Sequence, residues 1–399
     1  MEGSGAAQGD SVNLGPSNSP LVNYALKGLE RCWLREHGRW SHIYHLDGRD
    51  QPNESLPQSD VFYTLNVLLG ISRLKEGTHK IDTSAIFERN VLQLLTLPVA
   101  KYAFGMALWT AAQLKLDIPA NLRRHLKVLL SEPKYWWSFR AQDLGMILIG
   151  ILAEAKVDRK ELYRFAEPLY SFLLGRYHTP SGLFFDSPRG LRRRFASFAS
   201  QTYLTLACYW YGEFAGSTRA VEIANACTQK LIGLQGPNGE WPWFFDAETG
   251  RVLDFYEIYS VHQYGMAPAF LEHAEQHGVR TARDALIKGF HWVLGSNQLG
   301  EPMLVPEMHL SLRSHTRKRE LHTNKLRMIR AAYNVYFGGI ADFIDPVDIQ
   351  IRRECRSYEL GWILWSFGNR ADLPQLTHNP VFIDALKQYG GTPPQLPCC

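Results

Sequence analysis

Helical periodicity is the feature of this sequence that most restricts its fold. Apolar residues recur at the i, i+3, i+4, i+7 spacing of an α-helix in twelve windows of the chain. No stretch shows the sustained alternation of apolar and polar residues, bounded by tight turns, that marks a half-buried strand. The sequence therefore predicts an all-α protein. The windows lie at 19–34, 60–75, 83–96, 101–116, 118–130, 139–155, 159–176, 197–215, 217–235, 257–275, 280–295 and 356–368.

These windows alternate in character along the chain. Every second one, such as YAFGMALWTAAQL or DLGMILIGILAEA, is apolar on nearly all sides, whereas the windows between them carry a charged face. A helix that is apolar all round must be buried all round, and an amphipathic helix covers it from one side. Six buried helices, each preceded by an amphipathic one, predict an inner ring of helices inside an outer ring.

A short motif centred on glycine repeats in four of the predicted inner helices. Its glycines are Gly105, Gly145, Gly265 and Gly361. A glycine inside a helix costs about 1 kcal/mol relative to alanine. Its return at one point of a repeated hairpin indicates that neighbouring helix backbones approach closely there.

Twelve helices in this order resemble the (α/α)6 toroid, an (α/α)6 barrel of six helical hairpins. Six-hairpin glycosidases, several polysaccharide lyases and epimerases, terpenoid cyclases, protein prenyltransferase β-subunits and lanthionine cyclases share this architecture. The resemblance covers residues 19–375 and does not single out one family. We expect one toroid domain there, a flexible N-terminal tail at residues 1–18 and a C-terminal extension at residues 376–399.

Composition and motifs exclude several kinds of protein. Lys and Arg (43) nearly balance Asp and Glu (39), which argues against a nucleic-acid binder. The chain has neither a secretory signal pattern nor an apolar run long enough to cross a bilayer, and its six cysteines form no CxxC pair. It also lacks DxDD, DDxxD, HExxH and phosphate-loop motifs. We therefore expect a cytoplasmic protein with no metal or cofactor and no stable membrane insertion.

Long linkers precede several of the predicted inner helices. They span 35–59, 131–138, 177–196, 236–256 and 296–355. Long loops gathered at one end of a rigid barrel commonly carry function, and the N-termini of helices that follow them favour anions. Basic residues at 192–194 and between 313 and 327 are either a solvated face or a means of attracting an anionic substrate.

Three residues that lead into the fifth inner helix are the catalytic candidates, namely Asp254, Glu257 and His262. A carboxylate in an aromatic pocket has a raised pKa and can donate a proton, whereas one held by helix N–H groups stays ionised. Glycoside hydrolysis needs such a pair, and lyases and epimerases need a base, often Tyr or His. Each residue could instead cap a helix or be a satisfied polar group.

Aromatic residues nearby offer a surface for a sugar ring. Trp241 follows Gln235 and Gly239 in a spacing similar to the QW repeat of triterpene cyclases, where it implies a stabilising staple, and Trp243 stands two residues further on. The pair is either a sugar platform or a cluster that pins its own loop. The other predicted substrate-binding residues are Asp246, Tyr256, Tyr264, Asp60, Asp143, Gln201 and Glu359.

Taken together, these features favour a carbohydrate-active enzyme. It would catalyse the hydrolysis, elimination or epimerisation of a glycan or glycosyl compound, with carboxylate and histidine acid–base chemistry at the open end of the toroid. Its partner would be a small-molecule or oligosaccharide substrate, potentially anionic. Two alternatives stay open at this point, an isoprenoid cyclase or isomerase without the DxDD motif, and a toroidal binding module without enzymatic activity.

Overall fold

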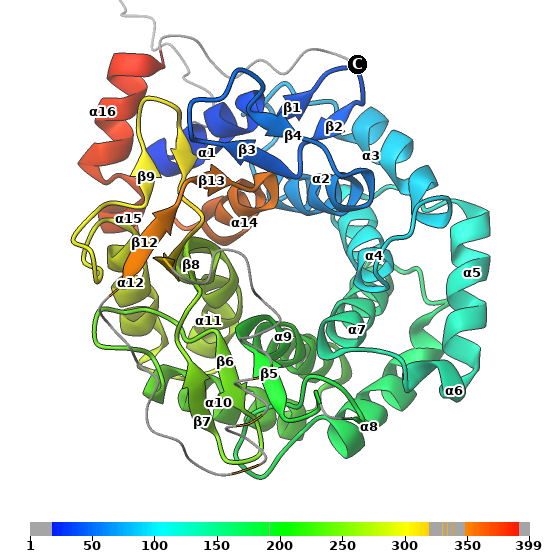
Figure 1. Cartoon of the computed structure of the whole chain (residues 1–399). Helices are drawn as coiled ribbons and strands as arrows, with labels where there is room; N and C mark the ends of the chain where they lie inside the picture. The colour runs from blue at the N-terminus through cyan, green and yellow to red at the C-terminus, as the bar shows by residue number, and fades with distance from the viewer. Residues whose placement is uncertain are drawn as a thin grey trace, which may run out of the picture.

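A ring of paired helices forms the body of the protein (Figure 1). The computed structural model describes residues 18–190, 192–318 and 348–390, with three isolated positions between the last two ranges. An outer helix precedes each inner helix, and the inner helices surround the centre. The predicted (α/α)6 barrel is therefore confirmed. The outer helices are α1 (Pro20–Arg31), α3 (Thr83–Val91), α5 (Ala120–Ser131), α8 (Ala166–Arg176), α10 (Thr218–Gly233) and α12 (Ala282–Val293).

The inner helices are buried along nearly their whole length, as their apolar sequences require. In contrast, the outer helix α5 buries only one stripe, Leu122, Leu126 and Leu130. The fifth inner helix opens with a π-helical turn, η3, that continues directly into α11. The inner set comprises α2 (Pro57–Ile71), α4 (Tyr102–Leu114), α7 (Ala141–Lys156), α9 (Phe198–Ala215), η3 (His262–Met266) with α11 (Ala267–Gln276), and α14 (Ser357–Phe367).

The repeated glycines lie where one inner helix touches the next. A Cβ atom on Gly105 of α4 would lie 2.3 Å from the carbonyl carbon of Met146 in α7. One on Gly145 of α7 would lie 2.7 Å from the backbone oxygen of Tyr203 in α9. Gly265 meets α14 and Gly361 meets α2 in the same way. The prediction that these glycines permit close helix packing is confirmed.

The ring closes between its first and last hairpins. Helix α14 packs against α2 on one side and against η3 on the other. Two short C-terminal helices, α15 (Pro374–Thr377) and α16 (Pro380–Tyr389), pack on α1, where Phe382 meets the ring of Tyr24 at 5.2 Å between centroids. Among the described residues, no helix is both long and apolar enough to cross a bilayer.

Short antiparallel strands occupy the linkers that lead from outer to inner helices. They form the three-stranded sheets β12-β11-β8, β13-β3-β4 and β5-β6-β7 and the pairs β1-β2 and β9-β10. With two to four residues each, these strands are too short to show the alternation by which a strand is read from sequence. Their bounds are Trp33–Leu34, Arg39–Trp40, Ile43–His45, Asn53–Glu54, Phe195–Ser197, Phe244–Asp246, Arg251–Asp254, Ile258–Tyr259, Leu304–Val305, Leu310–Ser311, Ser314–Arg317, Ile349–Arg352 and Glu354–Cys355 for β1 to β13.

The remaining described helices are short and lie in the connections between the longer ones. They are η1 (Leu92–Leu95), α6 (Pro133–Trp136) and η2 (Tyr163–Phe165).

Candidate active site

A cavity of about 250 Å³ lies inside the ring of inner helices. Every inner helix of the described structure contributes to its wall, together with residues from the linkers. The wall is aromatic and polar. Its lining residues are Phe62, Tyr63, Tyr102, Gln142, Ser197, Ala199, Tyr203, Trp243, Tyr259, His262, Met266, Arg313 and Tyr358.

These residues place the cavity at the N-terminal ends of the inner helices. Tyr102 and His262 are the first residues of α4 and η3, and Gln142 and Tyr358 are the second residues of α7 and α14. All four stand three positions before a repeated glycine. In each of these helices, the glycine contacts the neighbouring helix and the residue three positions before it lines the cavity. This end of the ring is also the end that carries the strands, where the sequence predicts the site.

Arg313, in the linker between β10 and β11, is the one cation of the described cavity wall. It donates a hydrogen bond to the hydroxyl oxygen of Tyr358 at 2.9 Å and forms an ion pair with the buried Glu359. Its guanidinium lies 4.6 Å from the ring centroid of Tyr259 and 5.6 Å from that of Tyr358. Two aromatic faces and one carboxylate therefore hold this charge in a fixed position at the cavity.

His262 forms the wall next to this arginine. Its side chain is buried, and its Nδ1 atom has no hydrogen-bond partner. Burial, and then the charge of Arg313, lower the pKa of His262 to about 3. The imidazole is therefore neutral at ordinary pH. The ring centroids of Phe198 and Tyr259 lie 4.6 Å and 5.1 Å from that of His262 and fix its plane.

Tyrosines complete the reactive part of the wall. Burial raises the pKa of both Tyr259 and Tyr358, so both are neutral phenols, although Arg313 acts in the opposite direction on each. The hydroxyl of Tyr259 donates to Glu257 at 3.0 Å. The hydroxyl of Tyr358 accepts from Arg313 and keeps its own proton available, and its ring packs on Tyr63 at 4.5 Å.

Most of the carboxylates predicted for the site lie behind this wall, each paired with an arginine. Such pairing satisfies a buried carboxylate and fixes its neighbours in place. Ser314 and Tyr259 also donate to Glu257. Burial raises the pKa of Glu359, against the lowering effect of Arg313. The pairs are Asp254 with Arg317 (2.9 Å), Glu257 with Arg352 (3.1 Å), Asp246 with Arg194 (2.8 Å) and Glu359 with Arg313.

Three predicted polar residues act as caps or tethers in the structure. Asp143 accepts hydrogen bonds from the backbone N–H groups of Tyr102 and Arg140, both at 2.9 Å, and thereby joins the starts of α4 and α7. Asp60 accepts from the N–H of Leu56 at 3.1 Å at the start of α2. The amide of Gln201 bonds to both backbone groups of Phe184, each at 2.8 Å.

The predicted aromatic candidates divide between core and cavity. Trp241 is 0% exposed and packs on Phe198 and Phe270, so it is a core residue, whereas Trp243 lines the cavity. The other two aromatic candidates are Tyr256 and Tyr264. The ring centroid of Tyr256 lies 5.0 Å from the guanidinium carbon of Arg317. The hydroxyl of Tyr264 bonds to Ser311 at 2.7 Å and to Glu359 at 3.1 Å. Of all the predicted site residues, His262 and Trp243 therefore line the central cavity.

Sequence reasoning missed Tyr63, Tyr102 and Tyr358 and placed Arg313 only within a basic group. The position three residues before the repeated glycine is the signal that finds Tyr102 and Tyr358. Arg313 has no such signal, because its partners come from β8 and α14, far from it along the chain. The residues of the same predicted basic group from Arg319 to Arg327 lie outside the described residues.

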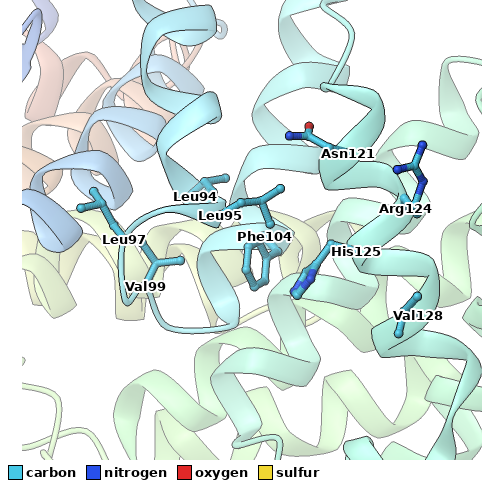
Figure 2. A pocket seen from close by; sticks show the side chains of 9 residues that line it. All are labelled: Leu94, Leu95, Leu97, Val99, Phe104, Asn121, Arg124, His125 and Val128. Atoms are coloured by element: carbon cyan, nitrogen blue, oxygen red, sulfur yellow. The ribbon is translucent and has the colours of Figure 1, made fainter.

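Two further cavities lined by described residues border the ring. One of about 460 Å³ adjoins the central cavity and shares Tyr102 and Gln142 with it. The other, of about 600 Å³, lies on the outside between η1, the start of α4 and α5 (Figure 2). Leucine and valine side chains dominate that outer cavity, with Arg124 and His125 along one side. In the described part of the chain, no group of three or more His, Cys, Asp or Glu residues is arranged to hold a metal ion.

Comparisons with known proteins identify the fold. No protein-family model and no curated protein matches the sequence. A sugar epimerase from a ruminal bacterium aligns over 88% of this chain and 97% of its own, with a TM-score of 0.57 and 10% identity. The GH76A α-1,6-mannanase of Salegentibacter sp. HEL1_6 aligns over 87% and 97%, with a TM-score of 0.53 and 11% identity. The unsaturated glucuronyl hydrolase of Bacillus sp. GL1 aligns over 91% of this chain and 96% of its own, with a TM-score of 0.53 and 12% identity. The chain therefore has the (α/α)6 toroid fold of these proteins, and no single family is identified.

Proposed function

We propose that this protein is a carbohydrate-active enzyme that removes the proton next to the carboxylate of a uronate, leading to epimerisation or elimination. One observation carries this proposal. A fixed cation, Arg313, lines the cavity together with two groups able to transfer a proton, His262 and Tyr358. The sugar epimerase and glucuronyl hydrolase of the same fold support a sugar substrate.

The proposed reaction follows from these three side chains. Arg313 binds the substrate carboxylate and stabilises the negative charge that spreads onto its oxygens when the neighbouring C5–H bond breaks. The proton passes to the neutral imidazole of His262, whose basicity rises as the bound substrate brings negative charge beside it. Tyr358 then donates its proton to the opposite face of C5, which epimerises the sugar. In elimination it donates instead to the glycosidic oxygen at C4, and the C4–O bond breaks as a C4=C5 double bond forms.

The composition of the cavity wall favours this chemistry over the other hypotheses. Hydrolysis requires two carboxylates that flank the bond, and the described wall of the central cavity contains neither Asp nor Glu. An isoprenoid site would present an apolar wall, whereas this wall carries Arg313, His262, Gln142 and several tyrosine hydroxyls. A sugar can use these groups as hydrogen-bond partners, with Trp243 as a ring to stack on.

Hydrogen exchange at C5 tests the proposal directly. The protein is incubated in D₂O with oligosaccharides that contain glucuronate, galacturonate or mannuronate, and products are read by NMR and by the ultraviolet absorbance of unsaturated uronates. We expect deuterium at C5 or an unsaturated product. The variants His262→Gln and Tyr358→Phe should each lower the rate at least about a hundredfold.

The control variant is Tyr24→Phe, which removes a buried tyrosine hydroxyl that bonds to Leu310 at 2.9 Å outside the cavity. It should retain the wild-type rate. Hydrolysis of a neutral glycan such as an α-1,6-mannotriose, without exchange on any uronate, would overturn the proposal. Loss of that hydrolysis in Glu257→Gln would then support the carboxylate chemistry predicted from the sequence.

A further inference from the structure

The cavity of about 460 Å³ beside the central one is built from the starts of α4 and α7. Its lining residues include Lys101, Ser138 and Arg140 in addition to the shared Tyr102 and Gln142. Because the two cavities share two wall residues, a ligand that fills the central cavity can extend past Tyr102 into the second. Ligand pockets usually have volumes of about 300–1,000 Å³, so the second cavity alone has room for another sugar.

The cations of this second cavity lie near carboxylates but form no direct ion pair with them in the described structure. Lys101 and Arg140 have no ion-pair partner among the described residues, in contrast to the arginine–carboxylate pairs behind the central cavity. The one carboxylate of the described wall is Asp143, and its two oxygens already accept the backbone N–H groups of Tyr102 and Arg140. Burial raises the pKa of Asp143, while the nearby cations Lys101 and Arg140 act to lower it.

A further arginine extends this positive region. Arg192 and Arg140 both act electrostatically on the buried Asp186, whose backbone oxygen accepts the N–H of Ala141 at 2.9 Å at the start of α7. Arg140 and Arg192 are exposed to solvent. Arg140 lines the second cavity, and an exposed cation without a direct ion pair is suited to bind a ligand anion, because such a ligand need not displace an existing carboxylate partner.

We propose that Lys101 and Arg140 form a second subsite that binds an anionic group on the sugar next to the reacting one. The inference rests on the proposed function and makes it more specific. The substrate is then a polyanionic glycan and not a single uronate, with one anion at Arg313 and the next at Lys101 and Arg140. Arginine binds a carboxylate or sulfate through two parallel hydrogen bonds, and lysine adds a point charge.

Calorimetric binding measurements test this subsite without requiring turnover. The dissociation constant of a uronate-containing tetrasaccharide is compared with that of a uronate methyl glycoside, for wild type and for the double variant Lys101→Met/Arg140→Met. We expect the preference for the tetrasaccharide to fall at least about tenfold in the variant. The salt dependence of tetrasaccharide binding should also become weaker, since fewer charges take part.

The double variant Lys387→Met/Arg280→Met is the matched control, because it removes the same two charges from exposed positions on α16 and beside α12. It should keep the wild-type preference. The single variant Arg140→Gln changes an exposed side chain and provides a test in case the double variant fails to fold. A sulfated and an unsulfated tetrasaccharide distinguish which anion the subsite prefers.

Equal tetrasaccharide preference in wild type and in both subsite variants would overturn the inference and leave the proposed reaction standing. If instead no uronate undergoes exchange but the variants lose the preference, the subsite stands and the proposed reaction fails.

Discussion

At the scale of single residues, the most informative group is a histidine that the protein keeps uncharged. His262 is buried among Phe198, Tyr259 and Arg313, so protonating it would place a second positive charge beside this arginine. Its pKa falls to about 3 in the folded protein, against 6.5 for an ordinary histidine. Because the folded pKa is depressed, His262 adds stability above pH 6.5 that is lost as the pH falls toward 3.

This linkage predicts a pH-dependent difference between wild type and His262→Gln. Lowering the pH from 7 to 5 should cost wild type about 2 kcal/mol more of its unfolding free energy than it costs the variant. Urea unfolding at the two pH values measures the difference. His315→Gln serves as the comparison, because burial lowers the pKa of His315 to about 4 at a position outside the cavity wall. A pH response of His262→Gln equal to that of wild type would contradict the assignment.

The same scale shows why individual site residues resist prediction from sequence. Trp241 and Trp243 are two positions apart, yet the first lies in the core and the second at the cavity. Asp254 and Glu257 stand in the predicted region, but their contacts are with Arg317 and Arg352 from strands far along the chain. A local pattern identifies which segment reaches the site. It does not tell which side of that segment faces the ligand.

At the scale of the elements, the repeated glycines set the distance between inner helices. The two backbones at Gly105 and Met146 are so close that a methyl group has no room. Gly175 of α8 is in the opposite situation, because a Cβ added there meets no atom within 4 Å. Substituting alanine at each of the two positions therefore separates the effect of helix packing on stability from the effect of helix propensity.

Gly105→Ala should destabilise the protein by about 3 kcal/mol, because the added methyl group must push α7 away from α4. Gly175→Ala should raise the stability by up to about 1 kcal/mol, because alanine favours a helix and meets no neighbour. Denaturant unfolding of both variants measures the two effects. Equal stability of the two alanine variants would show that the ring tolerates wider helix spacing than the structure indicates.

The helices could be predicted from sequence and the strands could not, and length explains the difference. A window such as that around α7 shows its buried character over several turns, so the periodicity is unambiguous. A strand of two residues such as β13 has no period to detect, and its partner β3 lies more than 300 residues away. Strands that pair across linkers, such as β13 with β3, form where the helices bring those linkers together.

At the scale of the whole molecule, the order of hairpins predicted the ring, and closure between the ends completes it. Helix α14 packs against α2, and α16 packs against α1. Contact between these helices therefore joins the first and last hairpins independently of chain connectivity. A circular permutant tests this point. It starts at Gly77, an exposed glycine with open space around it, ends at Glu76, and has residue 399 joined to residue 1.

We expect this permutant to fold and to unfold in one transition, with a loss below about 2 kcal/mol, or a few degrees in melting temperature. The new ends lie in the connection from α2 to α3, at the opposite end of the helices from the cavity. Circular dichroism and tryptophan fluorescence should follow the same melting curve. Separate transitions for the two probes would indicate that the ring is held by chain continuity and not by contact between its first and last hairpins.

Closure of the ring also determines what a partly synthesised chain looks like on the ribosome. Helix α2 emerges early, but the apolar flank around Gly70 that receives Gly361 stays uncovered until α14 has been translated. Until then the nascent protein exposes an apolar helix surface at each end of the incomplete ring, where another chain or a chaperone can bind. Interruption of translation before α14 leaves a fragment that has most of its helices and no enclosed centre.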